Sequence, residues 1–270
     1  MSARTGSQVV LITGASMGLG RDMAEMLAAD GWTVFGTSRD PARYSPEGWQ
    51  MLALDVTDDA SVRACVDQVM QRAGRLDALV NNAGYGLSAF AEEASVEEIR
   101  AQFETNYIGV HRMCRAVLPI MRAQGHGRIV NISSLAGLFG TPPSAHYAAS
   151  KHALEGYSQT MRFEVAQFGI HVSVVEPGLT KSAFRENVAE PAEPLAAYDR
   201  LRAHLREMGP RSEERAHPSI MVARTVRRVL RARNPRLRYT CTPLDWMAAH
   251  LRCWLPERAM HWIVRKVFGM

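Results

Sequence analysis

Short apolar runs alternate with longer helical patterns over the first two-thirds of the chain. The apolar runs predict strands at residues 9–12, 33–37, 51–54, 76–80, 128–132 and 170–175. Helices are predicted at residues 21–29, from a Thr57 N-cap to Arg72, from a Ser95 N-cap to about Met121 with a break near Gly109, and from about Ala145 to Phe168. Such alternation indicates parallel βαβ units in a sheet that is covered on both faces. The pattern therefore predicts an α/β protein, a Rossmann-like single domain with a doubly wound parallel sheet.

Residues 178–218 interrupt this alternation. Their composition is typical of loops, with prolines at positions 191, 194, 210 and 218. A doubly wound sheet binds ligands at the carboxyl ends of its strands, where a mobile insertion acts as a substrate lid. We therefore expect residues 1–240 to form a catalytic domain with a lid at about 178–218.

Residues 241–270 carry two amphipathic patterns, which predict a helical tail of the same domain. The apolar stripes comprise Met247, Leu251, Trp254 and Leu255, then Met260, Ile263, Val264, Val267 and Phe268. Three of the five tryptophans and the cations Arg252, Arg258, Arg265 and Lys266 lie in the same segment. A basic amphipathic helix with Trp can bind an anionic membrane peripherally. Alternatively, the stripes pack on the body or on a partner subunit and frame the substrate entrance, which is the interpretation we favour.

Composition and charge narrow the classes of protein. Hydrophobic residues make up 47% and charged residues 22% of the 270 residues, as in ordinary packed proteins. No apolar run approaches the ~18–20 residues of a membrane span, and the N-terminus lacks the apolar core of a signal peptide. We therefore expect a cytoplasmic protein, with peripheral membrane contact through the tail as the open alternative.

The net charge of +5 conceals a basic C-terminal part. Residues 200–270 hold 16 Lys and Arg against 5 Asp and Glu, a balance of +11. No motif or aromatic stacking platform accompanies these arginines, so we expect no nucleic-acid partner. The four cysteines form no CxxC, and the nine histidines lack ligand spacing, so no metal is expected.

A glycine-rich turn follows the first predicted strand. Gly14, Gly18 and Gly20 leave backbone N–H groups free to approach a phosphate at the N-terminus of the next helix. The spacing is not G-x-G-x-x-G, and such a turn is by itself a weak signal of nucleotide binding. Its position between a strand and a helix strengthens it.

An ordered set of motifs follows the same turn along the chain. It consists of Thr13-Gly-x3-Gly-x-Gly20, Asp55-Val56, Asn81-Asn-Ala-Gly84, Asn106, Ser134, Tyr147-x3-Lys151 and Pro177-Gly178. With these motifs the chain resembles the single-domain branch of the short-chain dehydrogenase/reductase family, over roughly residues 8–240. More loosely, it resembles the members that are hydroxysteroid and retinol dehydrogenases. The resemblance implies the strand order 3-2-1-4-5-6-7.

The resemblance also implies catalytic roles for four residues. Tyr147 is the proton donor in reduction and the base in oxidation. Lys151 lies four residues further along the same helix and lowers the pKa of Tyr147. Ser134 orients the substrate oxygen, with Ser133 as the adjacent alternative. Asn106 anchors a water in a proton relay. A phenol needs such help, because its ordinary pKa near 10 makes it a poor base at neutral pH.

Other positions are expected to hold a nicotinamide dinucleotide. They are Gly14, Ser16, Met17, Gly18, Leu19 and Gly20, then Arg39, Asp55, Val56, Asn82, Ala83 and Gly84, and finally Tyr147, Lys151, Pro177, Gly178 and Ser182. Ser38 stands where relatives that bind NAD carry an acid, and Arg39 follows it. An arginine suits the 2′-phosphate of NADP, so we expect NADP(H).

We therefore expect a ketoreductase, an NADP(H)-dependent oxidoreductase of a carbonyl/alcohol pair. An apolar stretch after Ser134, together with apolar residues of the lid, favours a lipophilic substrate. Two alternatives stay open: an NAD-linked dehydrogenase of the steroid or retinoid type, and a non-catalytic NADP-sensing protein on the same fold. We expect a homodimer or homotetramer.

Overall fold

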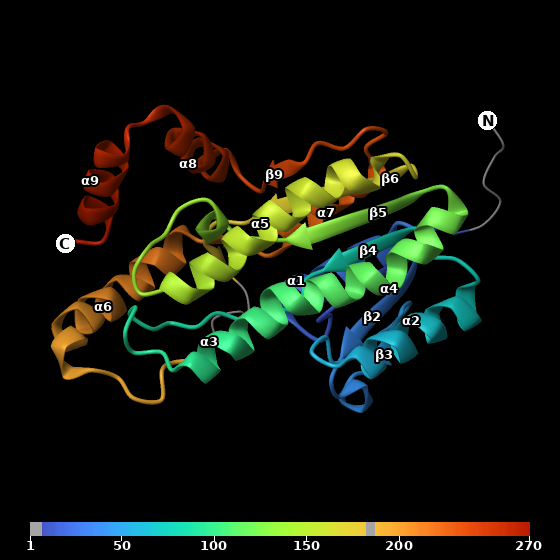
Figure 1. Cartoon of the computed structure of the whole chain (residues 1–270), viewed down its shortest axis with the longest axis horizontal. Coiled ribbons are helices and arrows are strands. Elements are labelled where there is room, and N and C mark those ends of the chain that lie inside the picture. The colour runs from blue at the N-terminus through green and yellow to red at the C-terminus, as the bar shows by residue number, and fades with distance from the viewer. Residues whose placement is uncertain (1–6, 182–186) are drawn as a thin grey trace.

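The computed structural model describes residues 7–181 and 187–270 and contains a seven-stranded parallel sheet (Figure 1). Its strands are β1 (Val9–Ile12), β2 (Thr33–Ser38), β3 (Gln50–Ala53), β4 (Ala78–Asn81), β5 (Gly127–Ile132), β6 (Ile170–Glu176) and β9 (Arg238–Thr240). Their order in the sheet is β3-β2-β1-β4-β5-β6-β9, and each neighbouring pair is parallel. This confirms the predicted fold class and strand order.

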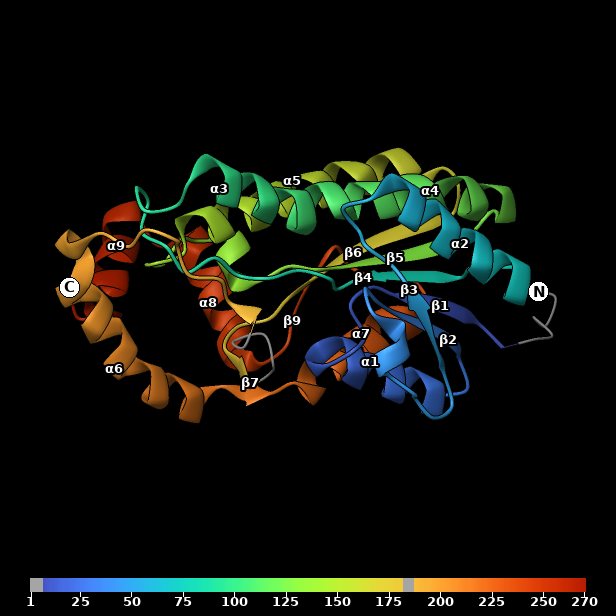
Figure 2. The same cartoon turned by 90° about the horizontal axis from the view of Figure 1, so that it is seen from below.

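Helices cover both faces of the sheet, and each face has its own apolar core. The helices are α1 (Gly18–Ala29), α2 (Asp59–Ala73), α3 (Val96–Phe103), α4 (Gly109–Gln124), α5 (Ala145–Ala166), α6 (Asp199–Arg215), α7 (Ile220–Arg231), α8 (Pro243–Trp254) and α9 (Glu257–Val267). Figure 2 shows α2, α4 and α5 on one face and α1 and α7 on the other. Buried side chains of these two groups form the two core clusters. The sheet is thus shielded on both faces, and its strand ends are left for ligands.

Local sequence signals predicted most helices and strands, but some of the predicted boundaries differ from those in the structure. The Ser95 N-cap is confirmed, with a capping box to Glu98. The predicted Thr57 cap is wrong, because Asp58 accepts the hydrogen bond from Ala60 that begins α2. The predicted break near Gly109 is a π-helical turn, Glu104–Ile108, between α3 and α4.

The lid is more regular than its proline content predicted. Its described part contains the 17-residue helix α6, so the expectation of a loop-rich lid is wrong for this stretch. Leu201, Leu205 and Met208 have the i, i+4, i+7 spacing of a helix, and the prolines at 191 and 194 precede it. A short parallel pair, β7 (Thr180–Lys181) and β8 (His217–Pro218), joins the two ends of the lid.

The helices α6, α8 and α9 gather at the end of the molecule to which the strands point with their carboxyl ends (Figure 2). The tail is helical, as predicted, but its stripes are only partly covered. Met260, Ile263, Val264 and Phe268 are half-buried. Met247 and Trp254 of the first stripe and Val267 of the second are exposed, whereas Leu251 and Leu255 are half-buried, so packing on this chain covers each stripe only in part.

Candidate active site

The turn between β1 and α1 forms a cradle in which the glycines are required by geometry. Gly14 and Gly18 have positive φ angles of 65° and 54°, which L side chains rarely adopt. A Cβ on Gly20 would lie 2.1 Å from the carbonyl oxygen of Gly14. Thr37 of β2 holds the turn, because its hydroxyl accepts from the Gly14 N–H at 3.2 Å. These features fit a phosphate bound at the N-terminus of α1.

The segment after β4 braces the same turn. The side-chain amide of Asn82 donates to the carbonyl oxygens of Thr13 and Gly14 at 3.0 and 2.8 Å. The Thr13 hydroxyl accepts from the N–H groups of Asn82 and Ala83, both at 2.9 Å. Two neighbouring parallel strands therefore present one rigid edge, as dinucleotide-binding sheets do at their switch point.

A cavity of about 550 Å³ lies beside the glycine turn. Its lining includes Ser16, Arg21, Arg43, Tyr44 and Trp49. Sequence reasoning missed Arg21 and Arg43, although both lie close in sequence to positions that it singled out. Both arginines are paired with acids, Arg21 with Glu25 and Arg43 with Asp40, each at 2.7 Å, and Glu25 and Glu47 also line the cavity.

Some of the other residues expected to hold the dinucleotide make contacts within the protein itself. Asp55 accepts from the Thr57 N–H and hydroxyl at 2.9 and 2.7 Å, and these hydrogen bonds lower the pKa of its carboxyl group. Val56 packs against Gly109, where an added Cβ would lie 2.9 Å from its side chain. Arg39 is exposed, and Ser182 lies outside the described residues.

Tyr147 and Lys151 lie one turn apart on α5 and face the end of β5. The Lys151 ammonium donates to the Ile132 carbonyl oxygen at 2.9 Å and lies 5.8 Å from the centre of the Tyr147 ring. Ser134, two residues after the end of β5, hydrogen-bonds to the Tyr147 side chain. Ser133 is instead buried beneath Gly137. The structure therefore joins Tyr147, Lys151 and Ser134 at the carboxyl edge of the sheet.

Burial dominates the electrostatics of this group. It raises the pKa of Tyr147 to about 12, against a smaller lowering by the hydrogen bond from Ser134. It lowers the pKa of Lys151 to about 8, against a smaller raising by the negative charge of Glu155. Removal of water disfavours each charged form. The protein by itself therefore keeps Tyr147 as a neutral phenol with a proton to donate.

Asn106 lies in the π-helical turn and is almost fully buried. Its amide donates to the Tyr85 carbonyl oxygen at 2.9 Å and to the Ser150 hydroxyl at 3.1 Å. Its oxygen accepts from the Tyr85 N–H at 3.1 Å. Asn106 thus ties the loop after β4 to α5, and its role in a proton relay stays a prediction.

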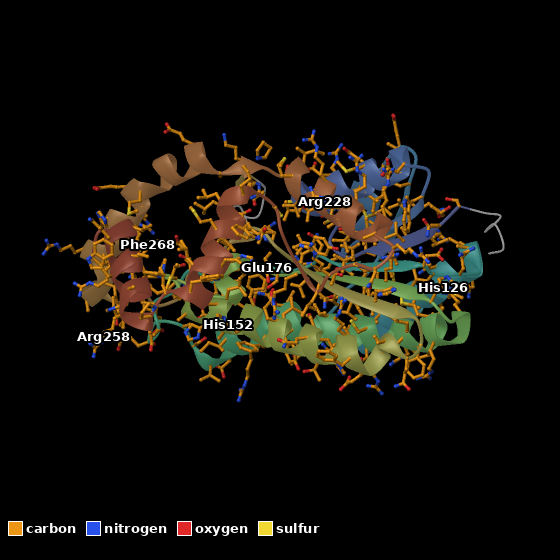
Figure 3. The ribbon with its side chains drawn as sticks, turned by 90° about the horizontal axis from the view of Figure 1, so that it is seen from above. His126, His152, Glu176, Arg228, Arg258 and Phe268 are labelled. Carbon is orange, nitrogen blue, oxygen red and sulfur yellow. The ribbon has the colours of Figure 1, made fainter. Side chains whose placement is uncertain are left out.

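A charge cluster that the sequence analysis missed, two buried glutamates with the partly exposed Arg238, lies behind Lys151. The Arg238 Nε lies 3.0 Å from a carboxylate oxygen of Glu155 and 3.2 Å from one of Glu176. Burial, with a smaller contribution from Glu155, raises the pKa of Glu176 to about 8, and Arg238 opposes this shift. Figure 3 shows Glu176 in the interior of the molecule. The cluster joins α5, β6 and β9 next to the active group.

The described residues lack the features of two other classes of site. Across residues 7–181 and 187–270, no helix is long and apolar enough to cross a bilayer. Over the same ranges, no three or more His, Cys, Asp or Glu side chains form a group that could hold a metal ion.

The sheet, the phosphate cradle and the Tyr–Lys–Ser group define an oxidoreductase of the Rossmann type that works with a nicotinamide dinucleotide. The family model described as short chain dehydrogenase matches residues 8–193. The chain belongs to the short-chain dehydrogenase/reductase family.

Relatives match the chain over nearly its whole length. A Bacteroides thetaiotaomicron protein named 3-ketodihydrosphingosine reductase is 39% identical, over 97% of this chain and 98% of that protein. Human 17-beta-hydroxysteroid dehydrogenase type 1 is 34% identical, over 97% and 86%. A solved short-chain dehydrogenase/reductase from Burkholderia phymatum, in complex with NAD, is 25% identical with a TM-score of 0.81, over 94% and 95%.

Proposed function

We propose that this protein is an NADPH-dependent reductase of a ketone on a lipophilic, long-chain molecule. The observation that carries the proposal is the group of half-buried Tyr147 and Ser134 with buried Lys151, in which the phenol is kept protonated. A protonated phenol suits reduction, because the carbonyl oxygen must receive a proton. We further propose a cytoplasmic homodimer or homotetramer.

Each residue of the group has a separate task in this reaction. The bound nicotinamide supplies a hydride to the carbonyl carbon. Tyr147 donates the phenol proton to the carbonyl oxygen as a general acid. Ser134 orients that oxygen with its hydroxyl group, as an oxyanion-type donor does. Lys151, fixed on the Ile132 carbonyl oxygen, places a positive charge beside Tyr147 and stabilises the phenolate that remains.

The preference for NADPH rests on the cations around the adenosine side of the cradle. Arg39 follows Ser38 at the end of β2, where a carboxylate would repel a 2′-phosphate. Arg21 and Arg43 line the cavity next to Ser16. A guanidinium binds phosphate through charge-assisted, bidentate hydrogen bonds. Because Arg21 and Arg43 are each paired with an acid at 2.7 Å, the proposed preference for a phosphorylated ribose rests mainly on Arg39.

The proposed substrate class rests on the apolar surroundings and on a relative. Leu135 and Phe139 follow Ser134, and Leu179 is 56% exposed at the start of the lid. The match to the relative named 3-ketodihydrosphingosine reductase covers 97% of this chain. We therefore favour a long-chain 3-keto amine such as 3-ketodihydrosphingosine. The similar human 17-beta-hydroxysteroid dehydrogenase makes a 17-ketosteroid the second candidate.

The test is turnover of 3-ketodihydrosphingosine and of a 17-ketosteroid with NADPH or NADH, with products identified by mass spectrometry. We expect Arg39→Ala to raise KM for NADPH about 10- to 150-fold, the range of one charge-assisted hydrogen bond, and to leave KM for NADH nearly unchanged. Exposed Arg63→Ala is the control. Equal losses with both cofactors would contradict the NADPH assignment. Absence of turnover with every ketone would favour the sensor alternative.

A further inference from the structure

The exposed faces of α8 and α9 carry large apolar side chains. On α8, Leu244 is 63% and Trp246 is 56% exposed, and Trp254 at its end is 81% exposed. On α9, Trp262 is 60% exposed. The other face of α9 is half-buried and leads to the C-terminus near α6, where a Cβ on Gly269 would lie 2.3 Å from His204. The tail thus approaches α6 at Gly269, while its three tryptophans are exposed.

The same surface is positively charged. Arg258, Arg265 and Lys266 are exposed on α9, and the Lys266 ammonium lies 4.7 Å from the Trp262 ring centre. Residues 243–270 contain two acids, Asp245 and Glu257, and Asp245 is buried at the start of α8. Cations interleaved with tryptophans are typical of helices that bind the interface of an anionic bilayer.

This surface adjoins the active site. The Asp245 carboxylate packs against Gly178, where an added Cβ would lie 2.1 Å from its oxygen and 3.3 Å from the Leu135 side chain. Leu135 directly follows Ser134. Figure 3 shows Arg258 of α9 and Phe268, which follows α9, at one end of the molecule and His126 at the opposite end. The basic, Trp-rich surface therefore lies at the end where the strands present their ligand-binding edge.

We propose that α8 and α9 dock the protein on an anionic lipid bilayer, so that a lipophilic ketone reaches the active site from the membrane surface. The source of the substrate rests on the proposed function, whereas the docking does not. The cations are attracted by anionic headgroups, with about 1 kcal/mol for each residue near the surface, or roughly fivefold in affinity. Tryptophan side chains favour the headgroup region because their rings are both apolar and polar.

The test is sedimentation of the full-length protein with phosphatidylcholine vesicles that do or do not contain 30% phosphatidylglycerol. We expect binding only to the anionic vesicles, with release at 0.5 M NaCl because salt screens surface charges. Arg258→Glu/Arg265→Glu is expected to weaken this binding more than tenfold, as is Trp254→Ser/Trp262→Ser. The matched controls, Arg63→Glu/Arg115→Glu and Phe163→Ser, alter exposed residues on other helices and are expected to bind like the wild type.

The outcomes separate docking from catalysis. Equal loss of binding in the Arg63→Glu/Arg115→Glu control would overturn the proposal, because net charge and not this surface would then be responsible. Absence of binding at low salt would also overturn the proposal. A third contrary outcome is that the wild type is a dimer that does not bind vesicles and that Trp254→Ser/Trp262→Ser dissociates into monomers. Reduction of a water-soluble ketone, measured without vesicles, tests the proposed function alone and is expected to be unchanged in all of these variants.

Discussion

At the scale of single residues, burial decides the charge states in the active site. The ordinary pKa values of a phenol and an ammonium are similar, but burial raises the first to about 12 and lowers the second to about 8. Tyr147 therefore holds its proton more firmly than Lys151 does. A protonated Tyr147 suits proton donation to a ketone. After donation the remaining phenolate depends on nearby positive charge for its stability.

Replacement of Tyr147 tests this assignment. Tyr147→Phe removes the proton donor with little change in volume, so kcat for ketone reduction is expected to fall 10²- to 10⁴-fold, the usual contribution of general acid catalysis. The Kd for NADPH, measured by fluorescence titration, should stay within about threefold. The control is Tyr157→Phe on the same helix, which loses a hydroxyl near His111 and should retain activity. A Tyr147→Phe enzyme within tenfold of the wild type would exclude Tyr147 as the acid.

At the scale of elements, one buried ion pair fixes the lid helix to the body. The Glu93 side chain is fully buried, accepts from the Leu195 N–H at 2.9 Å and lies 2.5 Å from the Arg202 guanidinium. The hydrogen bond from Arg202 is the main reason that the pKa of Glu93 is lowered to about 2. Phe90 also stacks on Tyr198 with ring centres 4.4 Å apart. The position of α6 over the site therefore depends on the loop between β4 and α3.

Loss of this ion pair should loosen the lid. Arg202→Met leaves the Glu93 carboxylate buried without its cation, so we expect a melting temperature lower by several degrees and a higher KM for the ketone. The comparison is Arg206→Met, on the same helix, whose partner Glu190 is exposed and whose loss should matter little. The measurements are differential scanning calorimetry and steady-state kinetics. Equal effects of the two changes would mean that the buried pair does not anchor α6.

At the scale of the whole molecule, Glu176 links stability to pH. Its folded pKa of about 8 lies above its ordinary value of 4.5. The group therefore contributes stability that is fully present below about pH 4.5. Between pH 4.5 and 8 the unfolded chain loses this proton while the folded protein keeps it, so stability falls by up to about 1.4 kcal/mol per pH unit.

Glu176→Gln should remove this dependence. Because glutamine does not ionise, the melting temperature of the variant is expected to rise relative to the wild type as the pH goes from 5 to 8. The exposed Glu190→Gln serves as the control, and its difference from the wild type should not change with pH. If the difference in melting temperature between wild type and Glu176→Gln stays constant from pH 5 to 8, a raised pKa at Glu176 is contradicted.

The sequence by itself determined six of the seven strands, all but β9, together with most of the helices and the pairing of Tyr147 with Lys151. These depend on periods of two to four residues, which are local and survive in a single sequence. The order of strands and the choice of Ser134 came from the family resemblance.

Tertiary structure alone decided which charges are buried and which apolar residues are left uncovered. Arg238 meets Glu155 across 83 positions and Arg202 meets Glu93 across 109, and no local pattern encodes such separations. The lid helix was not predicted because prolines precede it and one, Pro210, lies within it, although its apolar spacing was helical. The tail's hydrophobic stripes were visible in the sequence, but only the fold shows that Trp254 and Trp262 remain exposed. Burial depends on what the rest of the chain places opposite each side chain, and that is settled only when distant segments pack together.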